Sequence, residues 1–362
     1  LSDLNHITET IDEHIGMPQP SLGNAPSLER HHSIGKMSES HPLAPLSNLD
    51  LRKLSFIFLV LVSVAVQLMY KFSQKSGGGY EYNTMSSMAI TELVKFLMAC
   101  YAQRSIFKEK CGDLSVRQFL EKSVEEIKLH SENSGFLKVY IFLGISYAVG
   151  NQMVFKIMHV ADPGILSLIK STAPMLVAAM NFLIYRKTQT VPQMQCVILL
   201  LCGLIAVTNP PCDAKANTYT FFSFALMGSN TLLSAVNSVI NANALKELKM
   251  SMPMQNMVLY MIGFAANLVF YWFTSSSEGF FHGFGSVSVW VLIFLNATNG
   301  LAINAVYKYG DAVLKTFSQP LCSALLVGLS WAFFGMYMDR IKFQGAVTVV
   351  ITTYMYIQSP KA

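Results

Sequence analysis

Hydrophobic runs of about twenty residues dominate the chain from residue 54 onward, and short polar breaks separate them. A helix needs ~20 mainly apolar residues to cross a bilayer, and connections between packed helices are short. The pattern therefore predicts an all-α, polytopic membrane protein with ten transmembrane helices. The expected spans cover residues 54–71, 85–103, 136–158, 164–185, 190–209, 219–241, 253–274, 286–305, 310–336 and 341–358.

Residues 1–49 have a different character, because they are rich in Ser, His, Pro and Asn and contain no long apolar run. Such a segment cannot bury enough apolar surface to fold by itself. We expect a disordered tail. It holds five of the eight histidines, but no cysteine accompanies them, so a polar flexible tail is favoured over a metal site.

Composition supports the membrane assignment, since 52% of the residues are hydrophobic and only 13% are charged. Soluble domains carry about 25% charged residues. A soluble catalytic domain and a single-span anchored domain are therefore excluded. The net charge of +5 combines an acidic tail, with six acidic and two basic residues in 1–49, and a basic remainder.

Orientation follows from the basic residues in alternate connections, which favour the cytoplasmic side. Connections after the second, fourth and sixth spans hold ten Lys and Arg, whereas those on the other side hold five. We expect both termini and the long connection 104–135 to be cytoplasmic. The mixed charges of that connection predict an interfacial or solvated helix.

Two segments five spans apart resemble each other. Asp162 leads through an apolar stretch to Lys170 and Pro174, and Asp311 leads in the same way to Lys315 and Pro320. An odd offset makes the two copies cross the membrane in opposite directions, as in the inverted repeats of secondary transporters. We therefore expect two five-helix repeats, at 50–210 and 211–362.

Charged residues inside the spans are candidates for a site, because they are costly in a bilayer and usually face a cavity or a partner. Glu92 and Lys95 can pair as structural ions, or Lys95 can be shared with an anionic ligand. Lys170 has no acidic residue within one turn, which favours a phosphate ligand over snorkelling. Lys308 and Lys315 flank Asp311, as an ion-pair cluster at a helix end or as a phosphate site.

Polar and aromatic residues share helix faces at three further places. Tyrosine rings with amide groups suit a flat heterocycle, although polar side chains in spans also bond helix to helix. Small serine side chains would let a backbone or a ligand approach. The pairs are Tyr147 with Asn151, Asn256 with Tyr260, and Ser234 with Ser238.

Several catalytic patterns are missing from the sequence. There is no phosphate-binding loop of the G-x-x-x-x-G-K-[ST] type, no H-E-x-x-H pattern, and no C-x-x-C pair among the six cysteines. We therefore predict no enzyme activity, no metal, no cofactor and no nucleic-acid partner.

Five segments together resemble, in order and spacing, the nucleotide-sugar transporters of the CMP-sialic acid, UDP-galactose and UDP-N-acetylglucosamine branch. The resemblance covers residues 54–358. The segments are Thr91 to Lys95, Tyr147 to Met153, Gln255 to Tyr260, Gly279 to Phe284 and Lys308 to Ser318.

The resemblance implies a drug/metabolite transporter fold, a Golgi membrane location, and exchange of a cytosolic nucleotide sugar for lumenal nucleoside monophosphate. It implies that Lys95 lines the cavity, and a homodimer is possible. The residues that it would place around the nucleotide are Tyr147, Asn151, Ser234, Asn256, Tyr260 and Lys308.

The chain departs from the family pattern at Ala173, at Ala242 with Asn243, and at Val258. The family has a lysine, a Glu-Lys pair and a glutamine there, so substrate choice does not carry over. Two alternatives stay open: a carrier of the same fold for another phosphorylated metabolite, and a polytopic membrane transferase or its subunit.

Overall fold

The computed structural model describes residues 48–73, 81–160, 169–170, 172–208, 221–274, 279–334 and 339–359. Within these ranges every regular element is an α-helix, which confirms the all-helical prediction. The predicted tail 1–49 lies outside the described residues except for its last two positions, which begin the first described helix.

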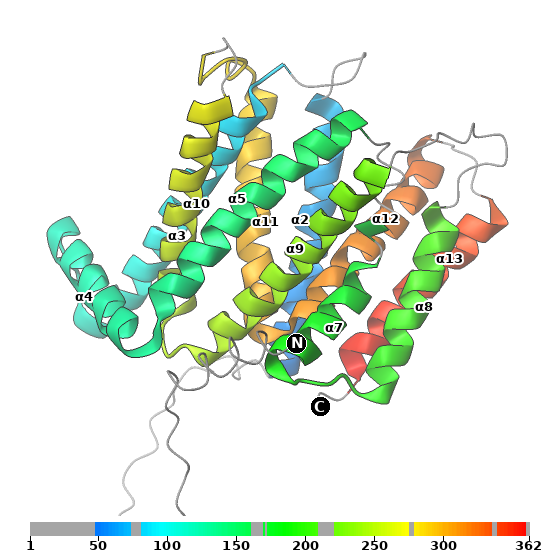
Figure 1. The fold of residues 1–362 in the computed structure, drawn as a ribbon, viewed down its shortest axis with the longest axis horizontal. Helices are drawn as coiled ribbons and strands as arrows, with labels where there is room; N and C mark the ends of the chain where they lie inside the picture. The colour runs from blue at the N-terminus through cyan, green and yellow to red at the C-terminus, as the bar shows by residue number, and fades with distance from the viewer. Residues whose placement is uncertain are drawn as a thin grey trace, which may run out of the picture. The chain divides into compact units, whose positions relative to one another are not determined.

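The helices follow one another with short connections, and Figure 1 shows the long ones running side by side. Each predicted span from residue 54 onward has a helix at its place. The helices are α2 Asn48–Ser73, α3 Thr84–Cys111, α4 Val116–Ser134, α5 Phe136–Val160, α7 Ala173–Tyr185, α8 Val191–Thr208, α9 Phe221–Glu247, α10 Met252–Thr274, α11 Val287–Tyr309, α12 Ala312–Phe334 and α13 Arg340–Gln358.

Length and composition make five of the described helices, namely α2, α3, α10, α11 and α12, suitable for crossing a membrane. Two shorter ones, α7 and α8, are also apolar. One boundary differs from the sequence prediction. Helix α3 continues to Cys111, so the helix expected in the connection 104–135 begins only at Val116. The predicted span 164–185 includes α7, but Asp162, in the first copy of the repeat, lies outside the described residues.

Local sequence signals account for several helix ends. The side-chain oxygen of Asn83 accepts hydrogen bonds from the backbone N–H of Met85 and Ser86, which caps α3. Ser115 and Gln118 cap each other's backbone at the start of α4. Gly135 ends that helix at a φ of +59°, a conformation that glycine adopts without strain.

Most long helices pack against a partner far away in the sequence. The largest contacts join α3 to α10, α8 to α13, α2 to α11 and α5 to α9. Gly203 and Gly345 let α8 and α13 meet closely, because a Cβ on Gly345 would lie 2.7 Å from the Gly203 carbonyl oxygen. Helix α12 contacts α2, α7 and α13, and so connects helices from the beginning, middle and end of the chain.

The outer faces of the helices are apolar, and polar side chains are buried inside the bundle beside an apolar core. Large apolar side chains such as Leu61, Trp272 and Tyr354 are exposed on the outer faces of their helices. Amide side chains are instead buried between helices, among them Asn237, Asn256 and others from α9, α10 and α11. An apolar outer surface suits lipid, and a polar interior can line a path for a polar solute.

Candidate functional site

Two cavities adjoin inside the bundle and share the side chains of Ser234, Ile303 and Lys315. The first, here called the lysine cavity, has a volume of about 340 Å³ and lies among α2, α7, α9, α11 and α12. The second, the amide cavity, has a volume of about 270 Å³ and lies among α3, α5, α9, α10 and α11. Because Lys315 borders both cavities, one ligand with two chemically different ends could occupy both of them.

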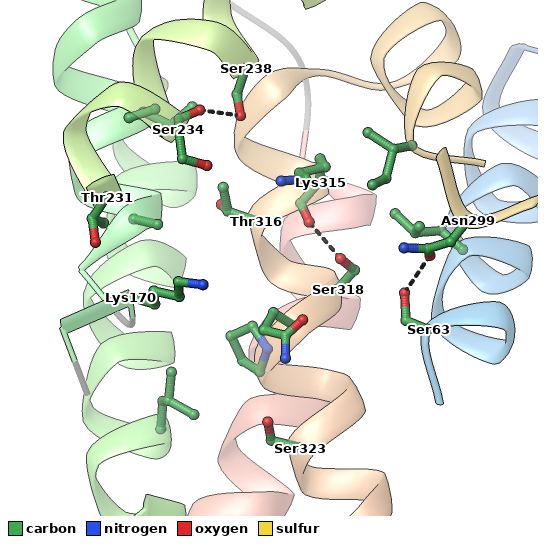
Figure 2. Close-up of a pocket in the computed structure, with 18 residues that line it drawn as sticks. Ser63, Lys170, Thr231, Ser234, Ser238, Asn299, Lys315, Thr316, Ser318 and Ser323 are labelled. Carbon is green, nitrogen blue, oxygen red and sulfur yellow. Dashed lines mark hydrogen bonds between the residues drawn. The ribbon is translucent and has the colours of Figure 1, made fainter. Parts of the chain in front are cut away.

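The lysine cavity presents two ammonium groups to a wall of hydroxyl groups. Figure 2 shows Lys170, just before α7, and Lys315 of α12 directed into the space between their helices. Neither ammonium group has an ion pair or a side-chain hydrogen bond within the described ranges. Hydroxyl groups line the walls around them, from Ser63, Thr231, Ser234, Ser238, Thr316, Ser318 and Ser323.

A proline in α12 leaves one backbone carbonyl without its helical hydrogen bond beside the lysine cavity. Pro320 lies inside α12 and has no N–H, so the carbonyl of Thr316 lacks its usual partner four residues on. Both residues line the lysine cavity. The hydroxyl groups of Thr316 and Ser318 donate to carbonyls of their own helix, at 2.6 and 2.7 Å. Their oxygen atoms remain able to accept hydrogen bonds from a ligand.

The amide cavity contains one ion pair held in a narrow slot. The Lys95 ammonium donates to Glu92 at 2.7 Å and lies 5.4 Å from the centre of the Tyr260 ring. Two glycines make room for the pair. A Cβ on Gly300 would lie 2.6 Å from Lys95 Cε, and one on Gly263 would lie 3.3 Å from a Glu92 carboxylate oxygen.

A network of asparagines connects the tyrosines of this cavity. The Asn241 amide nitrogen donates to the Tyr147 hydroxyl at 3.3 Å and to the Asn304 side-chain oxygen at 3.0 Å. The Asn304 nitrogen donates in turn to Asn256 at 2.7 Å and to the Tyr260 hydroxyl at 2.8 Å. The network therefore fixes both tyrosine hydroxyls relative to α9 and α11.

The structure brings most of the sequence-predicted residues to these cavities. Residues at the amide cavity are Glu92, Lys95, Tyr147, Asn151 and Tyr260; those at the lysine cavity are Lys170 and Ser238; Ser234 and Lys315 belong to both. Asn256 does not line either cavity; its side-chain oxygen accepts a hydrogen bond from Asn304, which lines the amide cavity.

Lys308 and Asp311 lie outside both cavities. The Lys308 ammonium donates to the carbonyl oxygen of Leu245 at the end of α9. The Asp311 carboxylate accepts from Arg52 at 3.4 Å and from the Tyr356 hydroxyl at 3.1 Å. Asp311 therefore forms an ion pair at this helix end, but within the described ranges its partner is Arg52 and not Lys308 or Lys315, and Lys315 points into the cavities.

Sequence reasoning missed Asn241, Asn304 and Tyr307, although all three border the amide cavity. The available signal was an asparagine inside an apolar span, which needs a partner in a membrane. The sequence does not show which neighbouring helix supplies that partner.

The fold and the cavities define a class: a multi-pass helical membrane protein with an apolar outer surface and a cationic, polar interior. The model of the nucleotide-sugar transporter family matches residues 47–357. The chain therefore belongs to the nucleotide-sugar transporter family, whose members are transporters and not enzymes.

The names of two relatives state different substrates. A UDP-N-acetylglucosamine/UDP-N-acetylgalactosamine transporter of Caenorhabditis elegans is 26% identical, over 86% of this chain and 95% of its own length. CMP-sialic acid transporter 2 of Oryza sativa subsp. japonica is 24% identical, over 91% of this chain and 90% of its own. A solved crystal structure shares the fold, with a TM-score of 0.60 and 12% identity over 84% of this chain and 95% of that one.

Proposed function

We propose that this protein is a Golgi antiporter that exchanges a cytosolic nucleotide sugar for a lumenal nucleoside monophosphate by alternating access. One observation carries the proposal: two lysines without ion pairs within the described ranges face a hydroxyl-lined cavity, which adjoins a cavity of tyrosines and asparagines. Lysines suit phosphate oxygens, and aromatic rings with amides suit a nucleobase. The names of the relatives favour a UDP-linked or CMP-linked sugar.

The helix contacts support the proposal of two inverted five-helix repeats. Helices α3, α7 and α8 each contact the helix that occupies the same place in the second half, namely α10, α12 and α13. Exchange of the two halves also converts the α2–α11 contact into the α9–α5 contact. Each repeat would contribute one lysine shortly before a proline, Lys170 before Pro174 and Lys315 before Pro320, which is consistent with both facing the lysine cavity.

Exchange follows from the charge of the empty cavity. An unpaired ammonium group inside the bilayer is costly, so the empty carrier would change its orientation slowly. A bound phosphate neutralises the lysines and lowers that cost. Each crossing therefore requires an anionic ligand, and a nucleoside monophosphate would serve on the return step.

Transport by reconstituted protein tests the proposal. Proteoliposomes preloaded with CMP, UMP or GMP take up labelled UDP-N-acetylglucosamine or CMP-sialic acid, and the initial rates identify the exchanged pair. Lys170→Ala and Lys315→Ala should each lower the rate at least about 10-fold, since each removes a charged hydrogen bond to phosphate. Lys108→Ala, which removes an exposed lysine paired with Asp113, is the control and should retain the rate.

The two alternatives give different results. A carrier of another phosphorylated metabolite would show no stimulation by any of the three nucleotides. A transferase would turn over the labelled donor in detergent, where transport is impossible. Equal rates for wild type, Lys170→Ala and Lys315→Ala would contradict the role of the lysines.

The proposed sidedness and assembly need measurements of their own. Both termini should be cytoplasmic, so a tag at either end should be digested by protease in sealed Golgi vesicles. The proposed homodimer is checked by the mass of the purified protein after subtraction of detergent.

A further inference from the structure

Among the described residues, two side-chain oxygens at the amide cavity have no hydrogen-bond partner, those of Asn241 and Asn267. Asn241 is only 1% exposed and borders the cavity from α9. Its amide nitrogen is used twice, for the Tyr147 hydroxyl and for the Asn304 oxygen. Its side-chain oxygen is buried and has no hydrogen-bond partner within the described ranges.

The neighbouring amides fix the direction of this side chain. The Asn304 nitrogen donates to Asn256 and to Tyr260, so the Asn304 oxygen must face the other way, toward Asn241. Two oxygens would repel, and Asn241 therefore turns its nitrogen to Asn304. This arrangement leaves the Asn241 oxygen as a free acceptor. A buried acceptor left unpaired is costly, so a ligand donor that reaches it gains affinity.

The surroundings indicate which part of a ligand brings that donor. Tyr147 and Tyr260 border the same cavity and belong to the same network as Asn241. Aromatic rings offer surfaces to a flat heterocycle. Of the lysines that line the amide cavity, Lys95 is paired with Glu92, and Lys315 is shared with the lysine cavity, which Lys170 also lines. Uracil has an N–H at ring position 3, and cytosine has an exocyclic amine at position 4. Either group is a donor that an amide oxygen can accept.

We infer that the side-chain oxygen of Asn241 accepts a hydrogen bond from a base N–H of the bound nucleotide, and so selects for an unsubstituted base edge. This rests on the proposed function and adds a specificity-determining residue to it. Asn267 carries the other unpartnered oxygen at this cavity, but within the described ranges its nitrogen donates to the Gly263 carbonyl of its own helix and not to a tyrosine.

Methylated nucleotides test the inference on the full chain, purified in detergent. Affinities of UMP and CMP, from ligand-dependent thermal unfolding, are compared with those of 3-methyl-UMP and N4,N4-dimethyl-CMP, which lack the base N–H. The 2′-deoxy forms of UMP and CMP identify a donor on the ribose instead. For wild type we expect methylation to weaken binding at least about 10-fold, and 2′-deoxygenation to weaken it less.

Variants assign the effect to Asn241. Asn241→Ala should bind UMP or CMP more weakly and should distinguish the methylated analogue by no more than about 2-fold, since the acceptor is gone. Asn241→Leu repeats the test with a side chain of similar size. Asn237→Ala is the matched control: Asn237 is one turn earlier on α9, 2% exposed, and its oxygen already accepts from Ser146 at 2.8 Å. It should retain the wild-type preference.

The outcomes separate this inference from the proposed function. If UMP or CMP binds but methylation has no effect, or if the ribose change dominates, the assignment of the base donor is wrong. An Asn241→Leu variant that still prefers the unmethylated nucleotide as wild type does would also overturn the inference. If Asn267→Leu loses that preference instead, the acceptor is Asn267 and not Asn241. If neither nucleotide binds wild type, the proposed function itself fails and the inference fails with it.

Discussion

Two groups of charged residues have opposite surroundings. At the helix ends, Arg52 and Asp311 form an ion pair, Tyr356 donates to the same carboxylate, and Lys246 donates to the Gly310 carbonyl at 2.5 Å. Inside the lysine cavity, Lys170 and Lys315 have no comparable partner within the described ranges. The first group has its partners in the protein, and the second can obtain them from a ligand.

The comparison separates stability from binding. A paired charge in the bundle contributes to holding helices together, so its loss should damage the fold. An unpaired charge in a cavity opposes folding but can bind an anion, so its loss should damage transport alone. Charge inside a membrane span is therefore insufficient evidence of a binding role; whether the described residues supply a partner is the informative observation.

Asp311→Ala should give the largest effect, on stability. The change leaves Arg52, which is 4% exposed, without its carboxylate, and it removes the cap on the Leu314 N–H. Loss of one partner from a buried pair costs ~3–5 kcal/mol. We expect a clearly lower midpoint of thermal unfolding in detergent. Glu121→Ala, which breaks an exposed pair with Arg117, is the control and should cost less than about 0.5 kcal/mol. Equal effects would remove the distinction between the two groups.

Lys315→Met should act in the opposite way. A side chain of similar length without charge relieves the cost of burying an ammonium, so the unfolding midpoint of the ligand-free protein should stay the same or rise. Nucleotide exchange should fall about 10- to 100-fold with the lost phosphate contact. A lower midpoint together with intact exchange would assign Lys315 to the structural group.

Gly300→Ala should give the smallest of the three effects and tests the slot of the Glu92–Lys95 pair. The added Cβ would lie 2.6 Å from Lys95 Cε, so the flexible end of that lysine has to move. Overpacking of this kind costs roughly 1 kcal/mol, or about 5-fold in affinity. Nucleotide affinity and unfolding midpoint are measured together, and Gly228→Ala is the control because a Cβ there meets no atom within 4 Å.

The sequence predicted the helices well because each apolar run defines its own element. It also selected Lys170 and Lys315, since a lysine inside a span has few structural uses. It gave the contact with the nucleotide to Lys308 and only a supporting role to Lys315, whereas the structure directs Lys315 into the cavities and Lys308 to a backbone carbonyl, on either side of the break at Gly310. The direction in which each lysine side chain points depends on how α11 and α12 pack against α9. This packing exists only in the folded protein and cannot be read from the sequence.

The asparagine network was less predictable for the same reason. Asn241 and Asn304 are 63 positions apart in the chain, and neither has a partner on its own helix that marks it as special. Helical periodicity identifies the residues that share a face of one helix. It does not identify the residues that meet across three helices.

The ammonium groups of Lys170 and Lys315 also have an electrical consequence. Each elementary charge that moves across a membrane gains or loses about 2.3 kcal/mol per 100 mV of potential. An empty carrier that turned its cavity from one side to the other would move the charge of Lys170 and Lys315 with it, whereas a carrier loaded with a phosphate dianion would move nearly none. If the proposed exchange takes place, the charge of these two lysines would connect its stoichiometry to the voltage across the membrane.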